Sequence, residues 1–371
     1  MNRTNPARKG WNRARLVRVF DLLDTLTRDG RLPAAAICVG GSAGVVESRV
    51  FGRMGPEPDA QAVRDDALFL VASITKPIVA TAALLLIERG ELLLDDPVAS
   101  ILPEFDRNGK RPVRLRHLLT HTSGLPDMLP NNLALRASHA PLSRFIEAIH
   151  ALPLAFPPGT AVRYQSMGFA ILSAVVERVT HVPIAEFLQR EVFEPLGMTD
   201  TSLGWNPEKR QRIAAIRIEA EQAGTDWHWN SPYWLGFGAP WGGLITSATD
   251  LALFCRMMLG NGDLEGIGVL SPATVRAATS NQLAAMPLLP EVDRTTRPWG
   301  LGWRLNWPGS SANFGDLLGP RAFGHWGSTG TLLWIDPDAD AFLVLLTTQP
   351  GGDDGRDLGR ISNAVAAALE E

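Results

Sequence analysis

The sequence predicts an α+β fold in which helices flank one antiparallel β-sheet, and a mainly helical lobe is inserted between the strands of that sheet. Three observations predict it. Strand-like segments lie near both ends of the chain, helical patterns fill the residues between them, and an isolated two-stranded ribbon would be only marginally stable. The strands from the two ends are therefore expected to pair in a single sheet.

The N-terminal part is expected to form a helix followed by a hairpin. Apolar residues recur at helical spacing over residues 11–28. Two apolar segments follow, 34–39 and 45–51, and the glycine-rich residues 40–44 between them are typical of a turn that joins two strands.

The middle of the chain is expected to be mostly helical. Between about residues 68 and 290, helical patterns alternate with loops rich in proline and glycine. Residues 169–179, for example, repeat their apolar positions at steps of three and four.

The C-terminal part returns to strands. Residues 331–335 and 341–347 are apolar and are separated by a turn rich in aspartate, and an apolar helix over 358–369 closes the chain. We predict one domain over residues 1–371, with an α/β lobe of about 1–76 plus 296–371 and a helical lobe of about 77–295. The cleft between the two lobes is the natural place for a binding site.

The composition favours a globular protein that acts on a small molecule. Hydrophobic residues make up 45% of the chain and charged residues 20%, which is enough apolar material for a large core. Lys+Arg 35 against Asp+Glu 39 gives a net charge of -4, and no long basic run is present. Nucleic acid is therefore not an expected partner.

The cysteines and the apolar segments give expectations about disulfides, the compartment and membrane insertion. Cys38 and Cys255 lie far apart in apolar surroundings, so neither a disulfide framework nor a thiolate metal cluster is expected. No secretion signal follows the basic N-terminus, so the expected compartment is the cytoplasm. The segment Ala67–Ile87 has membrane length, but Lys76 and Pro77 near its middle predict a segment buried in protein, with no membrane span. The oligomeric state stays open.

Lys76 is the first candidate for chemistry. The chain has four lysines among 35 basic residues, yet the single charge inside the apolar segment is a lysine. An ammonium can lose its proton when it is desolvated, whereas a guanidinium cannot, so Lys76 is a candidate base. Ser73 lies three residues earlier, which on a helix brings its hydroxyl to the same face. Ser-x-x-Lys also arises by chance, so the context decides.

Tyr164 and a C-terminal motif supply that context. Tyr164 follows a proline-rich loop and precedes a helix, so we expect it on an exposed loop, where a neighbouring ammonium would stabilise its ionised form. Packing against the next helix is the alternative for Tyr164. In Phe323–Gly330, small residues allow a close backbone approach, Ser328 can present an N–H to an oxyanion beside that of Ser73, and His325 is expected in the same cleft.

Five segments in this order resemble the serine β-lactamase-like superfamily, in the branch of class C β-lactamases and family VIII-type carboxylesterases: Ser73–Lys76, Leu118–Leu125, Tyr164–Ser166, Trp241–Asp250 and His325–Gly327. The resemblance covers the chain from about residue 30 to the end. It implies a penicillin-binding-protein fold and a nucleophilic serine that is acylated, Ser73. It further implies that Lys76 and Tyr164 transfer protons, that the N–H groups of Ser73 and Ser328 form an oxyanion hole, and that no metal or organic cofactor is used.

Two departures from the family pattern indicate the substrate. Ser166 stands where the second motif usually ends in Asn, which changes the grip on a substrate amide. His325 stands where β-lactamases carry a lysine that helps hold a carboxylate, and Trp326 adds bulk. With Gly327, these residues are expected to bind substrate, and they favour esters over penicillins.

We therefore predict a serine carboxylesterase that acts on a small-molecule ester through an acyl-enzyme on Ser73. The alternatives are a β-lactamase or D-amino-acid peptidase, an acyl-transferring transesterase, and a binding module without turnover. His121 is interpreted as a hydrogen-bonded loop residue and Ser247–Asp250 as a helix cap. The tryptophans at 227, 229, 234 and 241 are interpreted either as core or as one wall of an acyl pocket.

Overall fold

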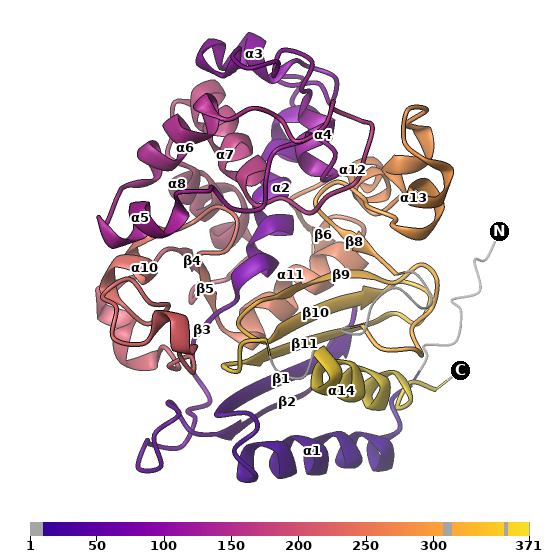
Figure 1. The fold of residues 1–371 in the computed structure, drawn as a ribbon. Helices are drawn as coiled ribbons and strands as arrows, with labels where there is room; N and C mark the ends of the chain where they lie inside the picture. Colours follow the sequence, from indigo (N-terminus) through magenta and orange to yellow (C-terminus); the bar gives the residue numbers. More distant parts are fainter. Residues whose placement is uncertain (1–9, 307–313, 352–354, 371) are drawn as a thin grey trace, which may run out of the picture.

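A six-stranded antiparallel sheet organises one half of the molecule, and its strands come from both ends of the chain (Figure 1). The computed structural model describes residues 10–306, 314–351 and 355–370. The strand order is β2-β1-β11-β10-β9-β8. Its strands are β1 (Ala34–Gly41), β2 (Gly44–Gly52), β8 (Arg304–Leu305), β9 (Phe323–Gly327), β10 (Thr331–Asp336) and β11 (Ala341–Thr347). The predicted α+β class, with one sheet assembled from the two chain ends, is confirmed.

The central strands are buried on both faces, which explains their continuous apolar sequences. Successive side chains alternate between two cores, so that Cys38 lies in the core on the helical side and Ile37 in the core on the opposite face. Strand β1 pairs with β11 from Ala35 opposite Thr347 to Gly40 opposite Phe342. Both cysteines are free and buried.

Helices cover both faces of this sheet. Helices α1 (Arg13–Arg28) and α14 (Arg356–Ala366) pack together over one face, and α11 (Ala248–Leu259) contacts β1 and β11 from the other (Figure 1). The Ser247 hydroxyl caps α11 by accepting from the N–H of Asp250 at 3.1 Å, as its sequence predicts. Helix α11, which falls within residues 77–295, therefore packs on the sheet.

The rest of the chain between β2 and β8 forms the mainly helical half. Helix α2 (Thr75–Glu88) runs through it and is buried from Thr75 to Leu86, so the membrane-length segment is indeed a buried one. The other helices are α3 (Val98–Ile101), α4 (Leu115–Leu119), α5 (Asn132–Ala137), α6 (Leu142–Ala151), α7 (Met167–Thr180), α8 (Ile184–Leu188), α9 (Glu194–Leu196), α10 (Pro232–Phe237), α12 (Pro272–Ala278) and α13 (Glu291–Thr296).

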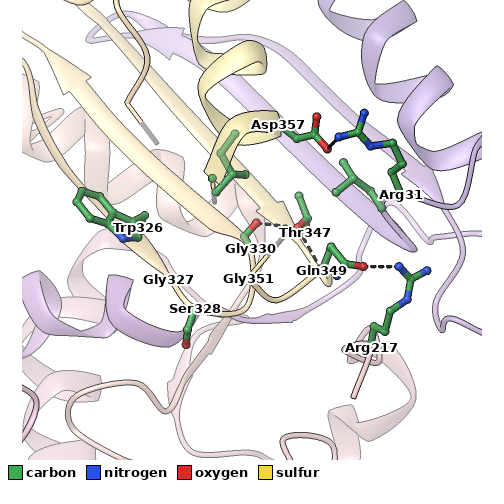
Figure 2. Close-up of a pocket in the computed structure, with 13 residues that line it drawn as sticks. Arg31, Arg217, Trp326, Gly327, Ser328, Gly330, Thr347, Gln349, Gly351 and Asp357 are labelled. Carbon is green, nitrogen blue, oxygen red and sulfur yellow. Dashed lines mark hydrogen bonds and ion pairs between the residues drawn. The ribbon is translucent and has the colours of Figure 1, made fainter. Parts of the chain in front are cut away.

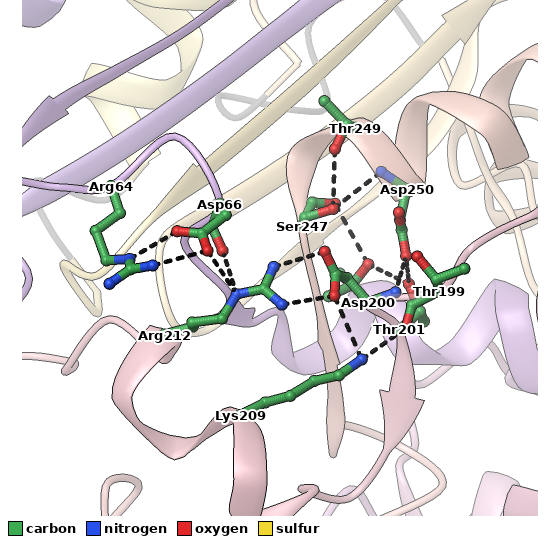
Figure 3. Close-up of polar contacts among 11 residues, drawn as sticks. Arg64, Asp66, Thr199, Asp200, Thr201, Lys209, Arg212, Ser247, Thr249 and Asp250 are labelled. Atoms are coloured by element: carbon green, nitrogen blue, oxygen red, sulfur yellow. Dashed lines mark hydrogen bonds and ion pairs between the residues drawn. The ribbon is translucent and has the colours of Figure 1, made fainter.

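Short strands and an ionic network connect the two halves. Strands β3 (Phe69–Leu70), β5 (Leu244–Thr246) and β4 (Ser202–Leu203) form a small sheet, and β6 (Asp263–Leu264) pairs with β7 (Ile267–Gly268). Figure 3 shows Arg212 between Asp66, just before β3, and Asp200, just before β4. The Asp200 N–H in turn donates to Asp250 of α11 at 2.8 Å. These contacts fix the segment that leads into Ser73.

No single helix in the described ranges is both long and apolar enough to cross a bilayer, although the bent pair 167–180 and 184–196 passes on length and composition alone.

Candidate active site

A cavity of about 320 Å³ lies where the sheet meets the helical half, and Ser73 is on its wall. Its lining comes from segments that are distant in sequence. The residues that line it are Leu70, Ala72, Ser73, Asp127, Met128, Arg136, Tyr164, Ser166, Trp229, Trp234, Trp241, Gly242, Trp326, Ser328 and Thr329. Ser73, Tyr164, Ser166, Trp326 and Ser328, all predicted from the sequence, thus border one cavity.

Ser73 is presented by a tight turn directly before a helix. It lies in the 3-10 turn η1 (Ala72–Ile74), and α2 begins two residues later. Ala72 has φ +46°, a conformation that is uncommon for a residue with a side chain. The turn is held by Thr75, whose Oγ1 donates to the Ala72 carbonyl at 2.6 Å and accepts from the N–H of Leu244 at 3.0 Å. A strained backbone with this support fixes the direction of the Ser73 hydroxyl.

The Lys76 amine lies beside the Ser73 hydroxyl. Its Nζ is 2.9 Å from Ser73 Oγ and 2.9 Å from the backbone carbonyl oxygen of Trp241. The side chain is fully buried, and this desolvation lowers the pKa of Lys76 to about 7, although the charge of Asp127 acts in the opposite direction. A substantial fraction of this amine is therefore neutral near pH 7, as a proton acceptor for Ser73 requires.

Tyr164 reaches the same serine from the other side. Its side chain is close enough to Ser73 for the two to interact, and Lys76 Nζ lies 4.7 Å from the centre of its ring. Burial raises the pKa of Tyr164, and the interaction with Ser73 offsets only part of that rise. The sequence predicts an exposed residue whose ionised form is stabilised by the ammonium. The structure instead holds a partly buried, neutral phenol, because desolvation dominates.

The loop that carries Tyr164 is anchored to the segment 117–123. The Gln165 side-chain amide donates to the carbonyl oxygens of His117 at 3.1 Å and Leu118 at 3.2 Å. The N–H of Gln165 donates to His121 Nδ1 at 3.1 Å, which confirms the interpretation of His121 as a hydrogen-bonded loop residue. The His121 ring also stacks on Tyr164, with 4.6 Å between centroids, a contact that the sequence did not predict. This clamp positions the phenol.

Ser166 is bound to an acid, Asp127, that no sequence motif indicates. Its hydroxyl donates to Asp127 Oδ1 at 2.6 Å, and both residues line the cavity. They are 39 positions apart in the chain, and no spacing rule links them. The hydroxyl that replaces the usual amide is therefore already engaged as a donor.

The turn between β9 and β10 closes the cavity next to Ser73. Thr329 Oγ1 donates to the Leu70 carbonyl at 2.8 Å, and Thr331 Oγ1 donates to the Val71 carbonyl at 2.9 Å. Ser328 is exposed at the cavity wall. Within the part of the chain that the structure describes, no backbone carbonyl accepts from the N–H of Ser73 or of Ser328. Both N–H groups are thus free to bind an oxyanion.

Gly327 and His325 lie elsewhere than expected. A Cβ on Gly327 would lie 2.2 Å from the Val71 carbonyl oxygen, so this glycine allows β9 to approach the nucleophile turn and does not line the cavity. His325 is 2% exposed and sits behind Tyr164, with 6.0 Å between ring centroids. Its Nδ1 is 2.8 Å from the Trp326 carbonyl oxygen, and burial lowers its pKa to about 3. It is a neutral support for the tyrosine.

A second, larger cavity of about 570 Å³ is bordered by the same strand end. Trp326 and Ser328 line both cavities, and Figure 2 shows them at one edge of the second. Its two arginines are already paired, Arg31 with Asp357 and Arg217 with Gln349. The chemistry therefore gathers in the smaller cavity. Among the described residues, no group of His, Cys, Asp or Glu is arranged to hold a metal ion.

Comparisons with known proteins define the class. The family model described as Beta-lactamase matches residues 19–368, so the chain belongs to the Beta-lactamase family of serine hydrolases. Penicillin-binding protein 4 of Amycolatopsis lactamdurans is 30% identical over 87% of this chain and 83% of its own. Esterase EstB of Burkholderia gladioli is 39% identical over half of each chain. A solved family VIII carboxylesterase has the same fold, with TM-score 0.79, 21% identity and coverage of 97% of this chain and 99% of its own.

Proposed function

We propose that this protein is a serine carboxylesterase that forms an acyl-enzyme on Ser73. The observation that carries the proposal is the buried Lys76 amine 2.9 Å from Ser73 Oγ, beside a cavity lined by Ser73 and Ser328, whose backbone N–H groups bind no backbone carbonyl in the described residues. A nucleophile, a base with a suitable pKa and donors for an oxyanion are the three parts that acyl transfer needs.

In the first half of the reaction, Ser73 Oγ attacks the ester carbonyl while its proton moves to Lys76 Nζ. The carbonyl oxygen becomes an oxyanion held by the N–H groups of Ser73 and Ser328. The bond to the alcohol oxygen then breaks. The leaving alcohol takes a proton from the Tyr164 hydroxyl, which regains one from Lys76.

In the second half, water attacks the acyl-enzyme and gives a proton to Lys76. The bond between Ser73 Oγ and the acyl carbon breaks, the acid is released, and the proton returns to Ser73. An alcohol in place of water would give acyl transfer by the same steps.

Strand β9, which carries His325 where β-lactamases have a lysine, supports esters over β-lactams as substrates. Its side chain at 325 is a buried neutral histidine, so β9 offers no cation to a penicillin carboxylate. The Ser166 hydroxyl already donates its one hydrogen bond to Asp127, so it cannot also donate to a substrate amide carbonyl. The relation to esterase EstB agrees with this preference.

A substrate panel tests the proposal. The wild type is assayed with p-nitrophenyl esters of increasing chain length, with nitrocefin and with a peptide ending in D-Ala-D-Ala, beside Ser73→Ala and a matched exposed serine, Ser280→Ala. We expect ester turnover in the wild type and Ser280→Ala, and at least about a 1,000-fold loss in Ser73→Ala. Lactam turnover without ester turnover would reverse the assignment.

Peptidase action is the second candidate, since a penicillin-binding protein is related over 87% of this chain. Release of D-alanine faster than ester hydrolysis would favour it. A fluorophosphonate probe separates both enzymes from a binding module, because a module with an unreactive Ser73 would stay unlabelled in mass spectrometry.

A further inference from the structure

Arg136 is a buried cation on the wall of the Ser73 cavity. It lies on α5, is only 7% exposed, and its Nε is buried without a hydrogen-bond partner. In the part of the chain that the structure describes, no carboxylate lies within ion-pair distance of it, although Asp127 lines the same cavity. Burial lowers the pKa of Arg136 to about 10, so the side chain stays cationic near pH 7.

The Arg136 guanidinium stacks on Trp234. The guanidinium carbon lies 3.9 Å from the centre of that ring. Stacking uses the face of the guanidinium and leaves the N–H donors at its edge available. By contrast Arg212, which is more exposed, is bound to carboxylates on both sides. A buried guanidinium without such a partner has its desolvation uncompensated.

We propose that Arg136 is the subsite for a carboxylate carried by the substrate, so that the preferred substrates are acidic esters. This inference rests on the proposed esterase function. The guanidinium edge matches a carboxylate in a two-bond geometry, and the substrate then supplies the missing counter-charge. The subsite lies on the wall formed by α5 and α10, away from β9, where β-lactamases place their cation.

The walls between the two groups specify the rest of the substrate. Trp229, Trp234, Trp241 and Met128 line the cavity together with Ser73 and Arg136. An apolar linker packs against such a wall, whereas a second negative charge would be desolvated without a partner in a cavity that already holds Asp127. The expected substrate therefore has an ester group and a carboxylate joined by an apolar chain or ring.

The test compares esters that differ only in a terminal carboxylate. On the acyl side these are p-nitrophenyl hydrogen adipate and p-nitrophenyl hexanoate, with the shorter succinate and glutarate half-esters to find the reach. On the alcohol side they are 4-acetoxybenzoate and phenyl acetate. We expect kcat/KM to favour the acid in one of these pairs by at least about tenfold, and that pair identifies the side of the ester that faces Arg136.

Arg136→Met should lower this acid-to-neutral ratio at least about tenfold, mainly through KM, and Arg136→Lys should give an intermediate ratio because it keeps the charge and loses the fork. The matched control is Arg49→Met. Arg49 is on the distant strand β2, and its guanidinium carbon lies 4.0 Å from the centre of the Phe20 ring. The acid-to-neutral ratio of this control should equal that of the wild type.

A binding measurement separates this inference from the esterase proposal. Calorimetric titration of Ser73→Ala should show binding of adipate and none of hexan-1-ol. A second substitution in that protein, Arg136→Met or Arg136→Lys, should weaken the binding of adipate at least about tenfold. If esters are not hydrolysed but adipate still binds through Arg136, the function is wrong and the subsite stands. An unchanged acid-to-neutral ratio in Arg136→Met, or equal adipate affinity with and without Arg136, would overturn the subsite.

Discussion

At the scale of single residues, burial decides which group around Ser73 can exchange a proton near neutral pH. It moves the pKa of Lys76 down to about 7 and the pKa of Tyr164 up, so the amine titrates and the phenol does not. The two histidines behind Tyr164 are also driven neutral, since burial lowers the pKa of His325 to about 3 and that of His121 well below its usual value. One titrating group remains among these four.

This asymmetry predicts the pH dependence of activity. For an ester substrate, kcat/KM should rise tenfold per pH unit below about pH 7 and level off above it, because the reactive form has a neutral Lys76. The pKa of Tyr164 is raised, so no loss from the phenol is expected up to about pH 9. The measurement is a pH profile from 5 to 9 in constant ionic strength. His325→Gln should keep the same midpoint. If the midpoint moved in this variant, the titrating group would be His325 and not Lys76.

The sequence revealed those site residues that short spacing or motif order connects, and it missed those that meet only through folding. Ser73 and Lys76 are three positions apart on one helical start, so their contact is local. Asp127 reaches Ser166 across 39 positions, and Arg136 reaches Trp234 from a different helix. Contacts of that kind depend on how helices pack, which no periodicity in one chain encodes.

At the scale of elements, the end of β9 is packed directly against the turn that carries the nucleophile. A Cβ on Gly327 would lie 2.2 Å from the Val71 carbonyl oxygen and 2.4 Å from Thr331 Oγ1, the hydroxyl that binds that carbonyl. These are backbone and well-anchored atoms, so a methyl group can be accommodated only if the strand and the turn move apart. Such a shift would separate the two oxyanion donors.

Gly327→Ala is therefore expected to lower kcat about 100-fold and the free energy of unfolding by about 1–3 kcal/mol. Steady-state kinetics and urea denaturation measure the two effects. The control is Gly268→Ala on the hairpin strand β7, where an added Cβ meets nothing within 4 Å. Wild-type kinetics in Gly327→Ala would show that the approach of β9 has no catalytic role.

The elements themselves were largely predictable, and their packing was less so. Short apolar segments and turn chemistry located the hairpin strands β1 and β2 and the strands β10 and β11, since these are local signals. The position of α11 was not predictable. The apolar pattern of α11 predicts that one face of the helix is buried, but it does not indicate that the six-stranded sheet covers this face.

At the scale of the whole molecule, the site destabilises the fold that carries it. Lys76 is buried in a segment that is otherwise apolar, and its pKa falls from 10.5 to about 7 on folding. The unfolded chain therefore binds a proton between these values that the folded chain does not. The burial of Lys76 therefore costs no stability above about pH 10.5, costs more as the pH drops toward 7, and has a constant cost below that. The penalty at pH 7 is about 4 kcal/mol at most.

Removal of this amine should make the protein more stable while it abolishes activity. Lys76→Met keeps the length of the side chain and removes the group that must be desolvated. We therefore expect the free energy of unfolding at pH 7 to increase by about 1–3 kcal/mol. This increase is smaller than the full desolvation penalty because the hydrogen bonds to Ser73 and Trp241 are lost. The difference from wild type should shrink at pH 10, where the other titrating groups affect both proteins alike. Lys76→Arg is the contrasting variant, since its charge cannot be lost, and it should destabilise at both pH values. Urea denaturation of the wild type and both variants at pH 7 and pH 10 measures these differences. If Lys76→Met were less stable than the wild type at pH 7, the hydrogen bonds of the amine would stabilise the fold more than its burial destabilises it.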